Sequence, residues 1–413
     1  MKAGYKQTEV GVIPEDWEVR SIGEVFRLVN GCAFKPEDWK ESGTPIIRIQ
    51  NLNDPTAAFN YSQAPVAERN RVDAGDLLFA WSGTIGSSFG ARVWDGPSGV
   101  LNQHIFKVHM DQQKITLPFS LLVFSRVEDD IAKQAHGFKA SFVHVKKSDL
   151  IKVNLPLPPI HEQRAIAEMM GNADGLICGL DRLLAKKRDL KKAAMHQLLT
   201  GQTRLPGFRG EWEVRRMSEI SWFQEGPGVR NYQFTNSGVK LLNGTNICRG
   251  VLNLETTTRY ISDIEAYGSY AHFLADEGDI VLASSGVTIE KLHEKIAFVK
   301  KEDLPFCMNT STVRFKPIEG IIVDHFLFQF LASDSFKKQI GNQATGSAQL
   351  NFGPSHVANV ALSLPPLPEQ TAIAEVLSEM DTEIAALERR REKTLALKQG
   401  MMQELLTGRT RLV

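Results

Sequence analysis

The chain has 413 residues, a length that fits two globular domains of ordinary size. Its 48 lysines and arginines equal its 48 aspartates and glutamates, so any surface that binds a polyanion must be a local patch. We find no signal peptide, no apolar run of membrane-spanning length, and no disulfide or zinc spacing among Cys32, Cys178, Cys248 and Cys307, which predicts a soluble cytoplasmic protein without membrane contact.

Residues 1–157 predict a first domain in which strands and helices are mixed. Short apolar runs at 44–49 and 75–80 are typical of strands, and they lie among turn-forming Gly, Asn, Ser and Asp residues. A helix is expected at 118–134, followed by a Gln-Ala-x-Gly loop. The pattern indicates an α+β domain with many loops.

Residues 158–204 predict one long helix. It opens with Pro158-Pro159 and carries Glu162 in its first turn, where an acid suits the positive end of the helix. It ends at Gly201, the residue type most common in a left-handed C-terminal cap. About 40 residues without proline correspond to roughly 60 Å of helix, at about 1.5 Å per residue.

The second half of the chain repeats the first. Residues 155–205 recur at 362–412 with an offset of 207, so that Leu-Pro-Pro-x-x-Glu-Gln opens a helix twice and Leu-Leu-Thr-Gly-x-Thr-Arg-Leu closes it twice. Upstream the repeat is fainter, as in Trp-Glu-Val-Arg at 17–20 and 212–215. The repeat predicts a second mixed domain at 205–364, with a helix at 323–343, and a second long helix at 365–413.

Apolar residues recur at three- and four-residue steps along both long helices, a pattern typical of coiled coils. We predict that the helices pair as an antiparallel coiled coil, which would relate the halves by a pseudo-two-fold axis and separate the two domains. Burial of each helix against its own domain is the open alternative. The predicted seam consists of Ile166, Met169, Leu176, Leu180, Leu183, Leu190, Leu198, Ile373, Val376, Met380, Ile384, Leu387, Leu395 and Leu405.

No set of residues assembles into an active site. His161-Glu162 begins like the zinc motif of metalloproteases, but Ala165 occupies the position that needs the second histidine. No phosphate-binding P-loop occurs, and no Asn/Asp-Pro-Pro-aromatic run of an amino-methyltransferase is present. The sequence therefore predicts no catalytic residue, no cofactor site and no metal site.

The duplicated helix start, the duplicated helix end and the opening segment 8–19 (TEVGVIPEDWEV) resemble the specificity (S) subunits of type I restriction–modification systems over the whole chain. The resemblance implies two target recognition domains, each reading one half of an asymmetric bipartite DNA site, with the helices as a spacer. It implies double-stranded DNA, two methyltransferase (M) subunits docked on the helices, and restriction (R) subunits as partners. It further implies that S-adenosylmethionine, ATP and Mg are bound only by those partners, which methylate adenine and cleave DNA.

Loops that correspond between the two copies supply the candidate DNA contacts, because base edges are read by polar side chains that reach into a groove. For each of these residues, a role in a turn or in a buried hydrogen bond is the open alternative. The candidates are Ser82, Thr84, Asn102, Gln103, His104, Lys139, Ser141, His144, Ser285, Asn309, Thr310, Ser311, Ser347, Gln349 and Asn351.

Two other functions remain open at this level. The chain could serve a different restriction–methylation assembly, which the neighbouring reading frames would reveal. It could also be an orphan DNA-binding scaffold, which would co-purify with no adenine methyltransferase. A stand-alone nuclease or methyltransferase is disfavoured, since the sequence contains no recognisable catalytic motif.

Overall fold

The computed structural model describes residues 3–54, 56–65, 67–135, 142–343 and 349–412, which form two compact units. Unit 1 consists of Met1–Gly179 with Arg391–Val413, and unit 2 of Leu180–Arg390. Each unit thus joins one mixed domain to part of both long helices. The sequence-based boundaries at 157, 204 and 364 differ from this division, because they keep each helix as a separate segment.

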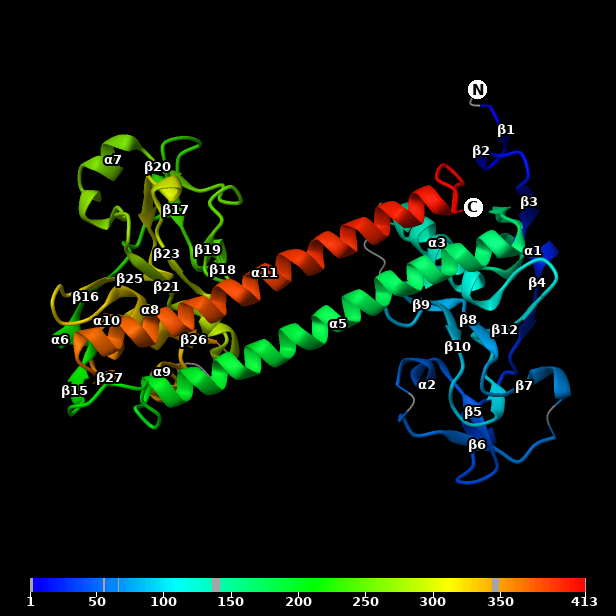
Figure 1. Cartoon of the computed structure of the whole chain (residues 1–413), viewed down its shortest axis with the longest axis horizontal. Coiled ribbons are helices and arrows are strands. Elements are labelled where there is room, and N and C mark those ends of the chain that lie inside the picture. Colours follow the sequence, from blue (N-terminus) through cyan, green and yellow to red (C-terminus); the bar gives the residue numbers. More distant parts are fainter. Residues whose placement is uncertain (1–2, 55, 66, 136–141, 344–348, 413) are drawn as a thin grey trace. The chain divides into compact units, whose positions relative to one another are not determined.

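Unit 1 is built on a four-stranded antiparallel sheet with the order β10-β8-β12-β4, and helix α3 packs against it (Figure 1). The rings of Phe79 in the sheet and Phe124 in the helix pack in a tilted arrangement, with centroids 5.1 Å apart, in a buried aromatic core. A second sheet, β6-β5-β11-β7, contributes to a smaller core that also contains Leu78 and Ala80 of β8 and Ile105 of β12. The elements are β1 Tyr5–Thr8, β2 Gly11–Pro14, β3 Glu18–Ser21, α1 Ile22–Val25, β4 Phe26–Asn30, β5 Thr44–Ile47, α2 Ile49–Asn53, β6 Asn60–Ser62, β7 Arg71–Val72, β8 Leu77–Ala80, β9 Ser82–Thr84, β10 Gly90–Val93, β11 Gly99–Leu101, β12 Ile105–Met110, α3 Leu117–Ala135, β13 Phe142–His144, α4 Lys147–Leu150 and β14 Asn154–Leu157.

Unit 2 repeats this plan with a four-stranded sheet β16-β25-β21-β23 and a three-stranded sheet β20-β17-β24. Its elements are β15 Glu213–Arg216, α6 Met217–Ile220, β16 Ser221–Glu225, β17 Val239–Leu242, β18 Ile247–Cys248, β19 Val251–Leu252, β20 Tyr260–Ile261, α7 Asp263–Tyr267, β21 Ile280–Ala283, β22 Ser285–Val287, β23 Ile296–Phe298, β24 Phe306–Met308, β25 Thr312–Pro317, α8 Asp324–Ala332, α9 Asp334–Gln343, β26 Leu350–Asn351, α10 Pro354–Ala358 and β27 Ala361–Leu364. The mixed fold predicted for both copies is confirmed.

The helix predicted at 323–343 is wrong in one respect, because it is two helices, α8 and α9. The chain breaks at Ser333, whose backbone is extended (φ −74°, ψ 158°). Its hydroxyl donates to the Phe330 carbonyl at 2.6 Å and accepts from the Phe336 N–H at 3.3 Å. Serine competes in this way for backbone groups that would otherwise continue a helix.

The long helices α5 (Ile160–Leu199) and α11 (Leu367–Leu405) are confirmed within the predicted spans. In unit 1 the first turns of α5 share a core with the last turns of α11, as Ile166 does with Leu405. In unit 2 the last turns of α5 share a core with the first turns of α11, as Leu198 does with Ile373. The pairing is therefore antiparallel within each unit. Ion pairs link the same helices, from Asp174 to Lys398 at 2.5 Å and from Lys191 to Asp381 at 2.5 Å.

The predicted seam is correct for part of its length and out of phase for the rest. Ile166, Leu180, Leu198, Ile373 and Leu405 are buried, and Val376, Met380, Ile384, Leu387 and Leu395 are half-buried. Met169, Leu176, Leu183 and Leu190 are wrong as seam residues, because each is more than a third exposed. The buried positions of α5 lie one residue later, at Met170, Ile177 and Leu184, and one residue rotates a helix face by about 100°.

In each unit, the repeated motifs of the sequence lie close together at the start of a long helix. Strand β3, which follows Trp17, pairs with β14 immediately before α5, and β15, which follows Trp212, pairs with β27 before α11. In unit 1 the buried Glu162 carboxylate accepts hydrogen bonds from the Trp17 indole at 2.9 Å and from Arg411 at 2.7 and 2.8 Å. The Arg411 guanidinium also reaches Asp16 at 2.8 and 2.9 Å.

We call this arrangement, in which an arginine and a tryptophan indole donate to a buried glutamate, the clamp. Unit 2 contains the same clamp with the repeats exchanged. The buried Glu369 accepts from Arg204 at 2.9 and 2.5 Å and from the Trp212 indole at 3.1 Å. The arginine that ends one repeat therefore binds the glutamate that opens the helix of the other repeat. The hydrogen bond to Glu369 raises the pKa of Arg204.

The glutamine of the duplicated Glu-Gln pair fixes the loop before the domain helix. The Gln163 side chain accepts from the Thr116 N–H at 2.9 Å and donates to the Lys114 carbonyl at 2.7 Å. Gln370 does the same with Val323 at 2.8 Å and Ile321 at 3.1 Å. Both glutamines are buried, so their polar atoms are satisfied inside the protein.

Candidate nucleic-acid interface

Four of the candidates in unit 1 gather around the Trp81 ring. Strand β9 pairs with β13 so that Ser82 faces His144, whose ring centroid lies 4.6 Å from that of Trp81. The ring of His104, in the connection between β11 and β12, has its centroid 5.2 Å from that of Trp81. Gln103 Nε2 lies 3.2 Å from His104 Nε2. Gln103 and His144 are exposed, whereas Ser82 is buried and Thr84 is half-buried. The structure thus brings together residues that the sequence separates by some 60 positions.

Asn102 and Asn309 occupy equivalent turns and have structural partners. The backbone N–H of Asn102 donates to Ile47 at 3.0 Å, and that of Asn309 donates to Leu242 at 3.1 Å. Each asparagine side chain then accepts from the next N–H, at 2.8 and 2.9 Å. A Cβ on the facing Gly31 or Gly226 would lie within 2.4 Å of the asparagine carbonyl oxygen, so both turns require a glycine partner. The turns leave Gln103 and Thr310 exposed.

The remaining candidates fall into two groups. The Ser285 hydroxyl donates to Asn351 at 2.6 Å, and both residues and Gln349 are exposed, while Ser311 is half-buried. Lys139, Ser141 and Ser347 lie outside the described residues. A DNA contact by any of these candidates stays a prediction.

Sequence reasoning missed a groove in unit 2, which we call the polar groove. It has a volume of about 450 Å³ and contains Ser285 and Ser311, two of the candidates. Its side chains are polar or small, with two cations, Arg259 and Lys295, and no carboxylate. The lining residues are Asn243, Gly244, Thr245, Asn246, Thr256, Thr257, Thr258, Arg259, Ser285, Gly286, Val287, Lys295 and Ser311. This charge balance suits a phosphate-bearing ligand.

A turn at residues 243–246, which directly follows β17, forms one wall of this groove. The buried Asn246 side chain accepts from the Asn243 N–H at 3.0 Å and donates to the Asn253 carbonyl at 3.1 Å. Unit 1 has a matching turn at 48–51, which is the first turn of α2, where the buried Asn51 accepts from the Arg48 N–H at 3.1 Å and donates to the Ala57 carbonyl at 3.0 Å. We call these the asparagine turns.

A sequence signal for the asparagine turns exists. Arg48 and Asn51 align with Asn243 and Asn246 at an offset of 195, the offset that also relates Trp17 to Trp212. In both copies an apolar strand ends in a polar residue with asparagine three positions later. Only the structure shows that this asparagine is buried and holds the turn.

The sequence matches the family described as type I restriction modification DNA specificity domain at residues 14–180 and again at 209–397. These two matches cover most of the chain. The chain belongs to this family.

Relatives and solved structures agree with the family along nearly the whole chain. The chain is 28% identical to the type I restriction enzyme MjaVIII specificity subunit of Methanocaldococcus jannaschii, over 97% of this chain and 94% of that protein. It is 22% identical to the EcoBI specificity subunit of Escherichia coli, over 95% and 85%. The fold is similar to that of a type I restriction–modification S subunit from M. genitalium, with TM-score 0.56, 15% identity and coverage of 94% and 96%. A structure described for complex assembly and conformational transition of the type I system gives TM-score 0.61, 17% identity and coverage of 96% and 99%.

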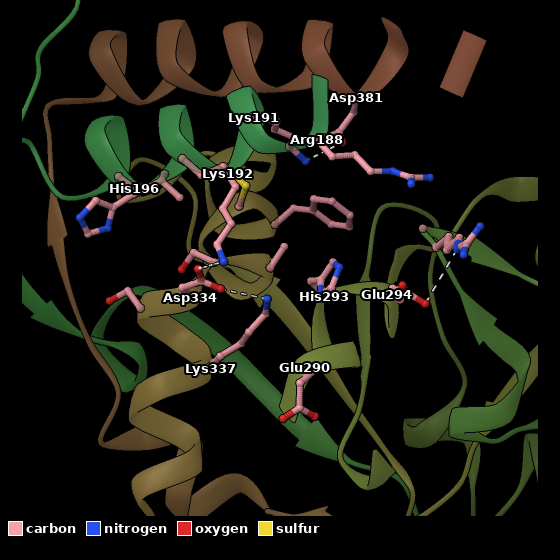
Figure 2. Close-up of a pocket in the computed structure, with 18 of the residues that line it drawn as sticks. Arg188, Lys191, Lys192, His196, Glu290, His293, Glu294, Asp334, Lys337 and Asp381 are labelled. Carbon is pink, nitrogen blue, oxygen red and sulfur yellow. Dashed lines mark hydrogen bonds and ion pairs between the residues drawn. The ribbon is translucent and has the colours of Figure 1, made fainter. Parts of the chain in front are cut away.

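Unit 2 of this chain has a second, larger cavity, of about 1100 Å³, beside α5, α8 and α9 (Figure 2). Figure 2 shows Lys192 and Lys337 both pointing to Asp334, at 3.3 and 3.1 Å, and Lys191 pointing to Asp381. Burial lowers the pKa of the His293 imidazole, which favours its uncharged form. The cations of this cavity are thus neutralised from within, unlike those of the polar groove.

Within the described ranges, no group of three or more His, Cys, Asp or Glu side chains is placed to hold a metal ion. Burial raises the pKa of the Cys307 thiol to about 12, so this cysteine is not a thiolate nucleophile at neutral pH. No helix in the described part of the chain is long and apolar enough to cross a membrane.

Proposed function

We propose that this chain is the DNA-recognition subunit of a type I restriction–modification complex and that each mixed domain reads one half of an asymmetric bipartite site. One observation carries the proposal: the two family-matched domains contain the same asparagine turn but present different side chains on it. The first turn offers Arg48 and Gln50, and the second offers Asn243 and Thr245. A shared scaffold with different polar side chains suits two readers of different sequences.

The exposed apolar residues of α5 support docking of partner proteins on the helices. Met169 and Leu176 in unit 1 and Leu183 and Leu190 in unit 2 follow one another at seven-residue steps, and each is 37–47% exposed. Residues seven apart lie on one face of a helix, so Met169 and Leu176 share an exposed face of α5 in unit 1, and Leu183 and Leu190 share one in unit 2, each beside the buried seam. We propose that these two apolar pairs, here together called the apolar stripe, contact two methyltransferase (M) subunits, with restriction (R) subunits joining them.

The chemistry is assigned to those partners. The chain selects the DNA site, and S-adenosylmethionine, ATP and Mg are used by the M and R subunits for adenine methylation and DNA cleavage. We further propose that this work takes place in the cytoplasm, where incoming DNA is met.

Methylome sequencing of the host with and without this gene tests the proposal. We expect an adenine-methylated motif with two unequal halves and an unread gap, which disappears when the gene is deleted and returns when it is restored. An unchanged methylome would contradict the proposal. Co-purification tests the orphan-scaffold alternative, since a scaffold without partners would bring down no adenine methyltransferase, whereas neighbouring reading frames separate type I from other assemblies.

A further inference from the structure

The asparagine turns are held more rigidly than an exposed loop requires. In unit 2, besides the two hydrogen bonds of Asn246, the Lys295 ammonium donates to the carbonyls of Gly244 and Ile247 at 3.3 and 2.8 Å. The Ser311 hydroxyl accepts from the Gly244 N–H at 3.1 Å. Side chains from other parts of the domain therefore fix the turn at Gly244 and at Ile247, in addition to the bond that Asn246 makes within it.

The side chains that the turn presents are themselves oriented. Asn309 donates to Asn243 Oδ1 at 2.9 Å, which fixes the Asn243 amide at the wall of the polar groove. Thr245 is exposed at the same wall. In unit 1 the Arg48 guanidinium donates to Asn60 Oδ1 at 2.8 Å and lies 4.8 Å over the Trp39 ring. Gln50 is exposed beside it.

These side chains have the chemistry of base readout. An asparagine amide pairs with adenine through two hydrogen bonds, an arginine pairs with guanine, and threonine contacts several bases. Such pairs discriminate only when the protein donor and acceptor are already in place, since a loose side chain adapts to the wrong base. The cations Arg259 and Lys295 lie in the same groove, where backbone phosphates of a bound duplex would be attracted.

We propose that the asparagine turns are the base-reading elements of the two domains. Asn243 and Thr245 read the half-site of the second domain, and Arg48 and Gln50 read that of the first. Asn51 and Asn246 are positioning residues that hold the turns, and Asn309 and Ser311 serve the same purpose in unit 2. This inference rests on the proposed function and adds which residues set its specificity.

The experiment uses the full chain expressed with its neighbouring partner genes in cells that lack them, followed by methylome sequencing. Asn243→Ala and Thr245→Ala are expected to lower methylation of the wild-type motif by about tenfold or more and to relax base preference in one half-site only. Arg48→Ala is expected to act on the other half-site. Thr245 is exposed, so Thr245→Ala tests readout without disturbing the internal hydrogen bonds that Asn243→Ala removes.

Asn236→Ala is the matched control. Asn236 is an exposed asparagine that precedes β17, whereas Asn243 follows the same strand, so the control lies at the opposite strand end from the turn. It should leave both half-sites unchanged. Asn246→Ala should relax the second half-site while the first half-site keeps its sequence, which a general loss of stability would not produce.

The outcomes separate this inference from the proposed function. If the wild-type chain directs no bipartite methylation, the proposed function itself fails. If the wild-type chain does so but Asn243→Ala, Thr245→Ala and Arg48→Ala all keep the wild-type motif at full occupancy, the turns do not read bases. Relaxation of both half-sites by one variant would also overturn the assignment of one turn to each domain.

Discussion

Removal of the Arg411 guanidinium should destabilise unit 1 more than any exposed charge substitution in its C-terminal segment. Arg411 binds Glu162, whose side chain is 0% exposed, through two hydrogen bonds of 2.7 and 2.8 Å. In Arg411→Ala, the Trp17 indole is the donor of the clamp that remains bound to the Glu162 carboxylate. Breaking a buried pair by removing one partner typically costs about 3–5 kcal/mol, because the remaining charge is buried without compensation.

A double-mutant cycle separates the pair from the packing around it. Glu162→Gln keeps the shape of the side chain and an acceptor for Trp17, so the double variant with Arg411→Ala has no buried charge at position 162. We expect it to be more stable than Arg411→Ala alone, with a coupling energy of about 2 kcal/mol or more between the two sites. Denaturant titration followed by tryptophan fluorescence and circular dichroism measures the free energy of unfolding of each variant, with the units resolved as separate transitions where they unfold separately.

Arg409→Ala is the control for this prediction. Arg409 lies two residues earlier, its side chain is 69% exposed, and its nearest carboxylate, on Glu404, is 3.5 Å away. Exposed pairs contribute about 0–1 kcal/mol, so this variant should differ little from the wild type. A loss for Arg411→Ala as small as that for Arg409→Ala, or additive single variants, would refute the view that the clamp compensates a buried charge.

Four further results are expected. The hydrogen bond from Arg411 lowers the pKa of Asp16. The stabilisation that Asp16 contributes is therefore complete above its unfolded-state pKa near 3.9, and it is lost as pH falls through the lower folded-state pKa. In an acid titration, the free energy of unfolding of Asp16→Asn should depend less on pH in that window than that of the wild type. Leu176→Glu and Leu183→Glu on the apolar stripe should reduce co-purification of the methyltransferase subunit without a large shift in Tm, whereas normal recovery would exclude the stripe as the docking face. Exchange of residues 1–154 for another recognition domain should alter one half-site in the methylome, and a change in both would contradict two independent readers. Insertion of one heptad in each helix, near Leu183 and Leu387, should lengthen the helices by roughly 10 Å and widen the unread gap by about three base pairs with both half-sites retained; an unchanged gap at full methylation would show that the helices do not set the spacing.

The sequence by itself determined the features that depend on short-range chemistry and on repetition. The offset of 207 identified two copies, and proline, glutamate and glycine marked the ends of both long helices to within a few residues. These signals are local, because a cap or a proline acts on the backbone within one turn. Gln163 was part of the recognised motif, but its role was not readable, since its partners at 114 and 116 are distant in sequence.

The tertiary structure decided which surfaces meet. The phase of the α5 seam could not be read from leucines alone, because the helix carries apolar residues on two adjacent faces and only packing selects Met170 over Met169. The asparagine turns were missed because asparagine after a strand resembles any turn, and only burial distinguishes a side chain that holds a turn from one that faces solvent. The partner of Glu162 also comes from the fold: one continuous helix of 40 residues runs between it and the arginine of its own repeat, so the buried carboxylate is compensated by Arg411 from the other repeat.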